Sequence, residues 1–254
     1  MTQHNMLKPE TDTRKFLRPE SISIVMPAYN EEAIIAEVIA DHTMHICDHF
    51  DQSEFIIVND CSTDRTKNVL ADCQRKFPKL KVIDNSKNSG HGASLLRAMN
   101  AANGDLVFQN DSDNQFFPED FWRLYDDLKV RGSDMTIGCR GERHDAVHRK
   151  IVSGLGKAFI FLTSGFWIKD SNSPFRLYRK NALSRILPVV NQLSPFFPSI
   201  LMVICAKKFR MNVGEVDIRH KARLTGTTFI RSFKILKLCY TAISEVLKLW
   251  RIKV

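Results

Sequence analysis

The sequence predicts an α/β fold in which a mostly parallel sheet is covered by helices on both faces. Short apolar runs of strand length alternate with segments of helical periodicity between residues 21 and 140. Polar residues follow these runs at the points where the strands would end. Right-handed crossovers would place those ends at one edge of a single sheet. The pattern therefore predicts a Rossmann-like sandwich with a ligand site at that edge.

Five strands and four helices account for residues 21–140. The predicted strands lie at residues 21–26, 54–59, 81–83, 106–110 and 135–138, and the helices at about 31–47, 62–77, 92–103 and 118–130. Pro27 lacks a backbone donor and should end the first strand, and Asn30 should cap the first helix. Gly104 suits the position directly after a helix.

After residue 140 the alternation loosens. Helices are predicted at about 150–165, 180–187 and 197–207, and strands near 175–178 and 213–218. The last segment places apolar residues at helical spacing among Lys and Arg (Phe229, Phe233, Leu236, Tyr240, Ile243, Leu247, Trp250). Such a helix either lies on an anionic membrane or packs on the domain or a partner subunit. We predict an N-terminal extension (1–20), one domain (21–228) and a basic amphipathic C-terminal helix (229–254).

Charge is distributed unequally along the 254 residues. Residues 1–139 hold 15 Lys and Arg against 22 Asp and Glu, whereas residues 140–254 hold 22 against 6. The basic half indicates an anionic partner, either the phosphates of a small ligand, an acidic membrane surface or nucleic acid. Its Lys and Arg lack interleaved stacking aromatics and a recognisable reading helix, which disfavours nucleic acid.

The sequence predicts neither a membrane span, nor an export signal, nor a zinc site. No uninterrupted apolar run reaches the roughly 18 residues that a spanning helix needs. Residues 1–20 lack the apolar core of a signal peptide, so a cytoplasmic protein is expected. The six cysteines are scattered without a CxxC pair, and we expect reduced thiols.

Asp111-Ser112-Asp113 forms an acidic step after the fourth predicted strand. Two carboxylates at this spacing reach one hard cation only if the chain turns there, because in a continuing strand they would lie about 7 Å apart. Mg²⁺ or Mn²⁺ held in this way keeps coordination positions for diphosphate oxygens. A solvated acidic turn explains the same residues, and the motif alone does not decide between the two.

Six motifs in a fixed order place the acidic step in a wider pattern. They are Ile24–Glu31 (IVMPAYNE), Ile57–Asp64 (IVNDCSTD), Asn88–Ala93 (NSGHGA), Ala102–Asp105 (ANGD), Asp111–Asp113 with Gln115, Pro118 and Glu119, and Ile137–Arg140 (IGCR). Over residues 21–228 the series resembles family 2 of the glycosyltransferases, and within it the polyprenyl-phosphate sugar transferases of dolichol-phosphate mannose synthase type. The resemblance implies a GT-A type sandwich and a nucleotide-sugar donor.

For the donor, the resemblance implies a site at the ends of the first two strands. Pro27, Tyr29 and Glu31 would line the base and ribose, and Asp60 would accept hydrogen bonds from the base. Uracil and guanine both present ring N–H donors, which suit a fixed carboxylate. The family's usual Asp-Asp pair is Asn59-Asp60 here, so the base-reading acid is kept and its neighbour is changed.

The acidic step would hold the diphosphate and the metal. The resemblance implies that Asp111 meets the diphosphate region and that Asp113, with Gln115, binds Mg²⁺ or Mn²⁺, so all three are candidate ligands. The family commonly shows Asp-Ala-Asp, and Ser112 is a small departure from it. The glycines of Asn88–Gly92 are expected to form a tight turn near the sugar nucleotide. That loop lacks the G-x-G-x-x-G order of a dinucleotide site, which disfavours hydride transfer.

Four arginines of the basic half match family positions: Arg140, Arg149, Arg176 and Arg223. Guanidinium groups fork onto phosphate oxygens, so Arg140 and Arg176 are expected to act on the leaving diphosphate, and Arg149, Arg176 and Arg223 on an acceptor phosphate. Phe229 replaces the lysine usual after the last motif, so one phosphate contact is expected to be lost. Asp170 is expected to be a general base for a hydroxyl acceptor, or to orient Arg176 or anchor a loop if the acceptor is a phosphate.

The resulting hypothesis is an inverting glycosyltransferase. It would move a sugar from a UDP- or GDP-sugar to a polyprenyl phosphate. We expect the protein to lie peripherally on the inner face of a membrane and to be able to form a homo-oligomer. Transfer to a sugar hydroxyl of a growing glycan, with Asp170 as base, is the alternative within enzymes. A sugar nucleotidyltransferase would need a basic glycine-rich loop after the first strand, which this sequence lacks.

Overall fold

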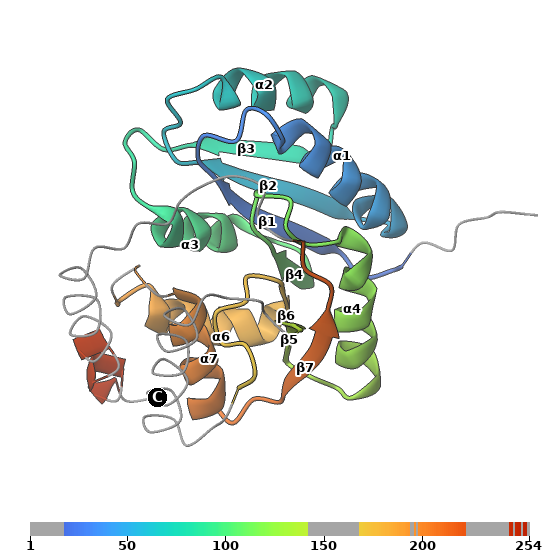
Figure 1. Ribbon diagram of the computed structural model, residues 1–254. Coiled ribbons are helices and arrows are strands. Elements are labelled where there is room, and N and C mark those ends of the chain that lie inside the picture. Colours follow the sequence, from blue (N-terminus) through green and yellow to red (C-terminus); the bar gives the residue numbers. More distant parts are fainter. Residues whose placement is uncertain are drawn as a thin grey trace, which may run out of the picture.

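A seven-stranded sheet of order β3-β2-β1-β4-β6-β5-β7 organises the chain (Figure 1). The computed structural model describes residues 18–141, 168–193, 196, 198–221, 244–245, 247–249 and 251–252. The strands are β1 (Ile22–Ala28), β2 (Ser53–Asn59), β3 (Leu80–Asp84), β4 (Leu106–Gln109), β5 (Met135–Arg140), β6 (Arg176–Arg179) and β7 (Val213–Ile218). All seven lie where the apolar runs predict a strand.

The sheet is parallel except for β6. β1 pairs in parallel with β2 and β4, β2 with β3, and β5 with β7, whereas β6 runs antiparallel to β4 and β5. The carboxyl ends of the six parallel strands therefore share one edge with the start of β6. The predicted mostly parallel α/β sandwich is confirmed, and this edge is the place for a ligand.

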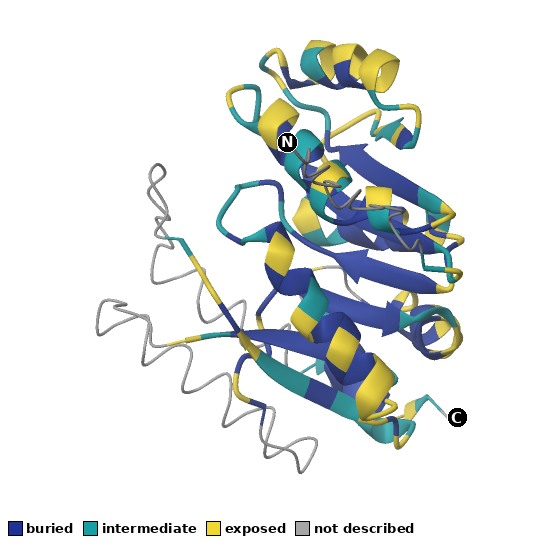
Figure 2. Cartoon of the chain, turned by 90° about the vertical axis from the view of Figure 1, so that its right-hand side faces the viewer, coloured by how far each residue is buried: buried dark blue, intermediate teal, exposed yellow. Residues whose placement is uncertain are grey.

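Helices cover both faces of the sheet (Figure 1). On one side α1 (Ile35–His45), α2 (Thr66–Lys76) and α4 (Phe121–Val130) pack on strand residues such as Ile24 and Met26. On the other side α3 (His91–Ala101), α6 (Lys180–Val190) and α7 (Pro198–Lys208) pack on residues such as Val25. Successive strand side chains point to opposite faces, so β1 is buried along its whole length. Figure 2 shows the strands in the middle of the sheet as buried.

Two predicted boundaries near the first strand were wrong. β1 continues through Pro27 to Ala28. β4 pairs with β1 only as far as Val25, so at Pro27 and Ala28 the paired strand is β2. Asn30 does not cap α1, which begins at Ile35 after a short turn. Asn30 instead adopts a left-handed backbone with φ of 56°, which asparagine tolerates better than most residues.

Gly104 has a different role from the predicted helix stop. α3 ends at Ala101, and Gly104 does not take a left-handed conformation. A Cβ atom at this position would lie 2.6 Å from the backbone nitrogen of Ser23. Glycine is required because the chain crosses directly against β1, where the Gly104 nitrogen donates to the Ser23 hydroxyl at 2.8 Å.

Only fragments of the predicted C-terminal helix belong to the described residues. Within them Leu249 is fully buried in the core cluster beneath α6 and α7, and the Lys208 ammonium donates to its carbonyl at 2.8 Å. Leu247 is 57% exposed. One side of this segment therefore packs on the domain, which was one of the two alternatives. The predicted helix at 150–165 lies outside the described residues, and none of the described helices is both long and apolar enough to span a bilayer.

Candidate active site

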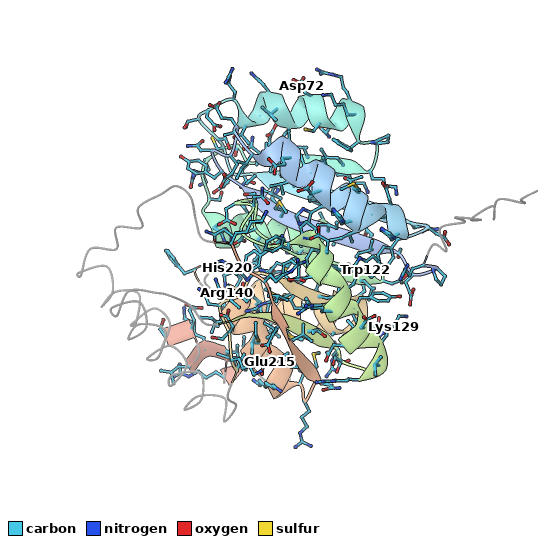
Figure 3. The ribbon with its side chains drawn as sticks, turned by 45° about the vertical axis from the view of Figure 1, so that its right-hand side comes forward. Asp72, Trp122, Lys129, Arg140, Glu215 and His220 are labelled. Atoms are coloured by element: carbon cyan, nitrogen blue, oxygen red, sulfur yellow. The ribbon has the colours of Figure 1, made fainter. Side chains whose placement is uncertain are left out.

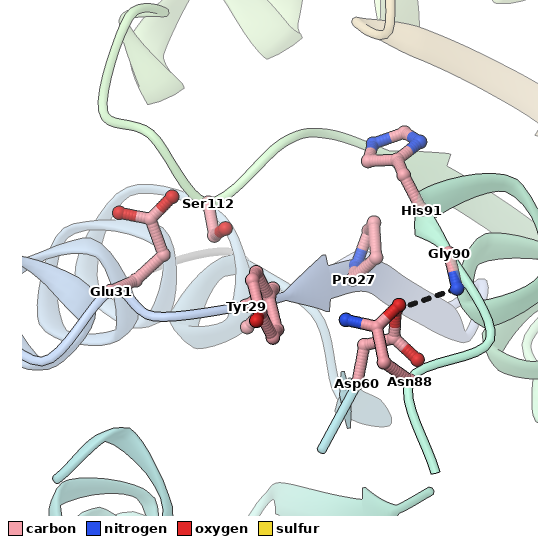
Figure 4. Close-up of a pocket in the computed structure, with 9 residues that line it drawn as sticks. Pro27, Tyr29, Glu31, Asp60, Asn88, Gly90, His91 and Ser112 are labelled. Carbon is pink, nitrogen blue, oxygen red and sulfur yellow. Dashed lines mark hydrogen bonds between the residues drawn. The ribbon is translucent and has the colours of Figure 1, made fainter. Parts of the chain in front are cut away.

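A cavity of about 310 Å³ opens at the carboxyl edge of the sheet (Figure 4). It is lined by the last residues of β1 and by residues that follow β1, β2, β3 and β4: Pro27, Ala28, Tyr29, Glu31, Asp60, Asn88, Gly90, His91 and Ser112. The four predicted donor-site residues of the first two strands are therefore brought together. Tyr29 leaves 44% of its surface exposed, so its ring offers a face for stacking.

Asp60 holds the loop that closes one side of this cavity. Its Oδ1 accepts hydrogen bonds from the Asn85 side chain at 2.7 Å and from the Ser89 backbone at 2.8 Å. Its Oδ2 accepts one from the Gly90 backbone at 2.8 Å (Figure 4). Burial alone would raise the pKa of Asp60, but these bonds, with a contribution from the Ser94 hydroxyl, lower it below its ordinary value. The group is therefore an ionised carboxylate at neutral pH.

The contacts of Asn59 show how an asparagine can replace the first acid of the family's Asp-Asp pair here. Its amide nitrogen donates to Oδ1 of Asp84 at 2.7 Å, and its oxygen accepts from the Ser62 hydroxyl at 2.6 Å. An aspartate at position 59 would face the Asp84 carboxylate at that distance. The asparagine thus joins the ends of β2 and β3 without a clash of like charges.

The loops after β1 and β2 are fastened to one another. The Asn30 side chain donates to the Thr63 hydroxyl at 3.1 Å and accepts from the Thr63 backbone at 2.8 Å. The Glu31 backbone donates to the Thr66 hydroxyl at 2.8 Å. Tyr29 and Asp60 are consequently held on neighbouring, mutually braced loops.

Asp111 faces the first residue of α3. Its Oδ1 accepts a hydrogen bond from Nε2 of His91 at 2.9 Å, across a contact that is partly exposed. Burial disfavours the charged imidazole, yet the bond and charge of Asp111, with the charges of Asp113 and Asp60, raise the pKa of His91. His91, whose charged form these carboxylates favour, therefore lies at the cavity beside the amino-terminal end of an 11-residue helix, where an anion is favoured.

Helix α1 contacts the residues on both sides of the acidic step, Asn110 and Asn114, and the sequence analysis did not predict these contacts. Nε2 of buried His42 lies 2.9 Å from the amide nitrogen of Asn110, the residue before Asp111. Its Nδ1 donates to the Val38 carbonyl at 2.8 Å, so Nε2 must be the unprotonated acceptor. Burial lowers the pKa of His42 to about 4, which keeps the ring neutral. On the other side of the step, Asn114 donates to Glu37 of α1 at 3.1 Å.

The segment after β7 contacts the chain just beyond the acidic step. His220 donates through Nε2 to the Gln115 side chain at 3.3 Å, and the Lys221 backbone donates to the Gln115 carbonyl at 2.8 Å. Figure 3 shows His220 near Arg140, in keeping with the pairing of β5 and β7 at this end. Gln115, a predicted metal ligand, is thus engaged by a neighbouring segment in this conformation.

The side chains of the acidic step fit part of a Mg²⁺ or Mn²⁺ site. Asp111 and Asp113 supply hard oxygen donors on either side of Ser112, which lines the cavity. The described residues contain no group of three or more His, Cys, Asp or Glu placed to hold a metal by themselves. A cation held by these two carboxylates would need further ligands, and phosphate oxygens of a bound nucleotide are ones that Mg²⁺ commonly takes.

Arg140 and Asp170 form a forked ion pair. Nε of Arg140 donates to Oδ2 of Asp170 at 2.7 Å, and Nη2 donates to Oδ1 at 2.9 Å. Their side chains are only 12% and 11% exposed. Both carboxylate oxygens are therefore engaged, and Asp170 orients Arg140 rather than Arg176. Neither residue lines the cavity described above.

Arg176 has a structural role instead of the predicted phosphate contact. Its side chain is fully buried, and its nitrogens donate to the carbonyls of Ser173 at 2.7 Å, Ser199 at 2.5 Å and Ser171 at 2.5 Å. The guanidinium ties the segment before β6 to the start of α7. The other predicted phosphate contacts, Arg149 and Arg223, lie outside the described residues.

A comparison with known families decides the identity of the chain. The model of the family described as "Glycosyl transferase family 2" matches residues 23–187, which is more than half of the sequence. The chain belongs to this family. The resemblance inferred from the six motifs is therefore confirmed, and the chain is a glycosyltransferase.

The relatives of this glycosyltransferase include bacterial enzymes that act on a lipid phosphate. It is 28% identical over 225 residues to the undecaprenyl-phosphate 4-deoxy-4-formamido-L-arabinose transferase of Edwardsiella ictaluri, covering 88% of this chain and 67% of the relative. The Pseudomonas aeruginosa enzyme of the same name is also 28% identical, with 88% and 64% covered. The chain thus spans about two thirds of the length of these curated relatives.

Solved structures place the glycosyltransferase among GT-A folds. Glucosyl-3-phosphoglycerate synthase from Mycobacterium tuberculosis, in complex with phosphoglyceric acid, matches with a TM-score of 0.63 and 20% identity, over 92% of this chain and 81% of that one. A mannosyltransferase from Pyrobaculum calidifontis, in complex with GDP-Man and Mn²⁺, matches with a TM-score of 0.62 and 13% identity, over 93% and 66%. At this identity the likeness establishes the fold.

Proposed function

We propose that this glycosyltransferase moves a sugar from a nucleoside-diphosphate sugar to a polyprenyl phosphate with inversion at the anomeric carbon. The observation that carries the proposal is the cavity at the carboxyl edge, where an aromatic face, an ionised carboxylate and the acidic step meet. Relatives named undecaprenyl-phosphate sugar transferases support the lipid phosphate as acceptor class.

In the donor complex, each side of the cavity would have a separate task. The base would stack on Tyr29 and donate to Asp60, while Pro27 and Glu31 border the ribose. His91, whose pKa the neighbouring carboxylates raise, would meet the diphosphate. Asp111 and Asp113, with Gln115 after release from His220, would hold Mg²⁺ or Mn²⁺. When bound, the cation stabilises the negative charge that develops on the departing diphosphate.

For the acceptor, a phosphate needs no general base because it is already anionic. Asp170 agrees with this acceptor class, since both of its oxygens accept from Arg140 and it is nearly buried. Arg140 would then carry one fixed positive charge at the end of β5. The acceptor would attack the anomeric carbon on the face opposite the leaving diphosphate. The predicted contacts of Arg149 and Arg223 with the acceptor phosphate remain part of the proposal.

The proposed place of action is the surface of an anionic membrane, where a polyprenyl phosphate is presented. The basic half of the chain supplies the charge for this surface. Phe196 and Leu247 are large apolar side chains that are 69% and 57% exposed, and such residues suit the lipid boundary.

Transfer by the purified protein tests the proposed function. The protein is incubated with Mn²⁺, a panel of radiolabelled UDP- and GDP-sugars, and vesicles that contain undecaprenyl phosphate. We expect label in the lipid fraction, and none when the vesicles lack the lipid phosphate. Label that enters a soluble oligosaccharide instead would contradict the acceptor assignment.

A further inference from the structure

The segment after β7 brings a lysine to the loop that follows the acidic step. The Lys221 backbone nitrogen donates to the Gln115 carbonyl at 2.8 Å. The preceding residue, His220, forms an antiparallel β-bridge with Phe116. The start of the Lys221 side chain is therefore fixed against the chain two residues beyond Asp113.

Asn114, the residue directly after the acidic step, holds the other end of this side chain. Its Oδ1 accepts from the Lys221 ammonium at 3.2 Å, while its Nδ2 donates to Glu37 of α1 at 3.1 Å. If the amide turned round, its NH₂ group would face the ammonium and its oxygen would face the carboxylate, so both bonds would be lost. Nζ of Lys221 also lies 4.8 Å from the centre of the Phe117 ring, a contact that favours a cation. The positive charge thus has a defined place beside the acidic step.

Lys221 differs from Arg219, a cation two residues earlier in the same segment. Arg219 lies 4.4 Å from the centre of the same Phe117 ring, but it also pairs with Asp120 at 3.0 Å. Within the described part of the chain, no carboxylate pairs with the Lys221 ammonium, and Asn114 accepts from one of its three N–H donors. Its charge and its remaining donors are therefore available to an anionic ligand.

The charge balance at the acidic step calls for such a cation. The carboxylates of Asp111 and Asp113 together cancel the charge of one divalent cation between them. The negative charge of a diphosphate, which grows as the sugar departs, must then be met by other groups. Arg140 and Arg176 are engaged within the fold, whereas Lys221 keeps its charge for a ligand.

We propose that Lys221 is a phosphate-binding residue, whose ammonium contacts a phosphate group held at the acidic step. The inference rests on the proposed function, because that function brings phosphate groups to this place. It goes further by giving a role to a residue outside both the six motifs and the cavity lining. The phosphate belongs either to the diphosphate of the donor or to the lipid acceptor, and the two sources predict different measurements.

Lys221→Met tests the proposal, because it removes the charge and keeps an apolar side chain of similar length over Phe117. Calorimetric titration of the full chain with UDP and GDP in the presence of Mn²⁺ measures the donor side. The KM for undecaprenyl phosphate in vesicles measures the acceptor side. We expect one of these two affinities to weaken by about tenfold or more, the factor for a lost charge-assisted hydrogen bond. Lys221→Arg keeps the charge and should bind the same phosphate more tightly than Lys221→Met does.

The pattern of losses identifies the phosphate. Weaker binding of the nucleoside diphosphate assigns Lys221 to the donor, and a raised KM for the lipid with unchanged nucleotide affinity assigns it to the acceptor. If both affinities stay at the wild-type values, or if Lys221→Arg is no better than Lys221→Met, the inference is overturned. Lys129→Met is the matched control, since Lys129 also lies over an aromatic ring, that of Tyr125, but pairs with Glu20. A wild-type chain that neither binds a nucleotide nor transfers a sugar would instead refute the proposed function itself.

Discussion

The two halves of the sheet edge use their charged residues in opposite ways. After β1, β2, β3 and β4, the polar side chains brace the loops and still border a cavity, as Asp60 and His91 do. At the end of β5 and the start of β6, the charged groups have partners within the fold: Arg140 pairs with Asp170, and Arg176 donates to three carbonyls. A charge at a strand end is therefore not sufficient evidence for a ligand contact, because its partners decide what it can bind.

The largest expected effect lies on the cavity side of this comparison. Asp113→Ala should lower turnover by about 10²–10³-fold, because it removes a ligand of the cation that stabilises the leaving diphosphate. The side chain is only partly buried, so the melting temperature should change little. Steady-state transfer rates over a range of Mn²⁺ concentrations provide the measurement. Asp72→Ala, an exposed acid on α2 paired with Arg75, is the control. Wild-type turnover in Asp113→Ala would rule out the metal assignment.

On the other side of the edge, substitution of Arg176 should reduce stability. Arg176→Met leaves three buried carbonyls without their donors and is expected to lower the free energy of unfolding by about 4 kcal/mol. Urea unfolding of the variant measures this loss. Arg75→Met, at a side chain that is 73% exposed, should cost less than about 0.5 kcal/mol. If the Arg176→Met protein were stable and had a raised KM for the lipid phosphate, the structural role would be contradicted and the predicted phosphate contact supported.

A third prediction concerns the support beneath the acidic step. The folded pKa of His42 is about 4, below the ordinary value of 6.5, so only the unfolded chain takes up this proton as the pH falls between those values. Stability should therefore be lost through this window, by about 3 kcal/mol in total, and be unaffected by this group above it. His42→Phe, which keeps a ring between Phe55 and Phe108, should lack this component in urea unfolding at pH 7.0 and 4.5. An identical pH dependence in the variant would contradict the assignment.

His42→Phe also tests whether α1 positions the acidic step. The variant loses the bond to Asn110, whose Oδ1 is already without a partner among the described residues. We expect the Mn²⁺ concentration for half-maximal activity at pH 7.5 to rise about threefold or more. A purely structural role would lower the melting temperature and leave that concentration unchanged.

The sequence predicted the elements and the cavity better than the partners of single side chains. Hydrophobic periodicity is local, so every described strand falls where the pattern places it, and the polar strand ends identified Tyr29 and Asp60. Pairings across the fold leave no local signal: His42 and Asn110 are 68 positions apart, and Arg140 and Asp170 are 30 apart. For Arg176, the family motif predicted a phosphate contact, and only the structure shows that this side chain is fully buried.

The smallest effect is expected at the ion pair of Arg140 and Asp170, and it separates the two acceptor classes. With a phosphate acceptor, Asp170→Asn should lower turnover less than tenfold and keep the acidic limb of the pH–rate profile, because no base is removed. A double-mutant cycle with Arg140→Gln should give a coupling of about 1–2 kcal/mol in stability, since the forked contact is mostly buried. If Asp170 were the base for a sugar hydroxyl, turnover would fall at least 10²-fold and the acidic limb would disappear.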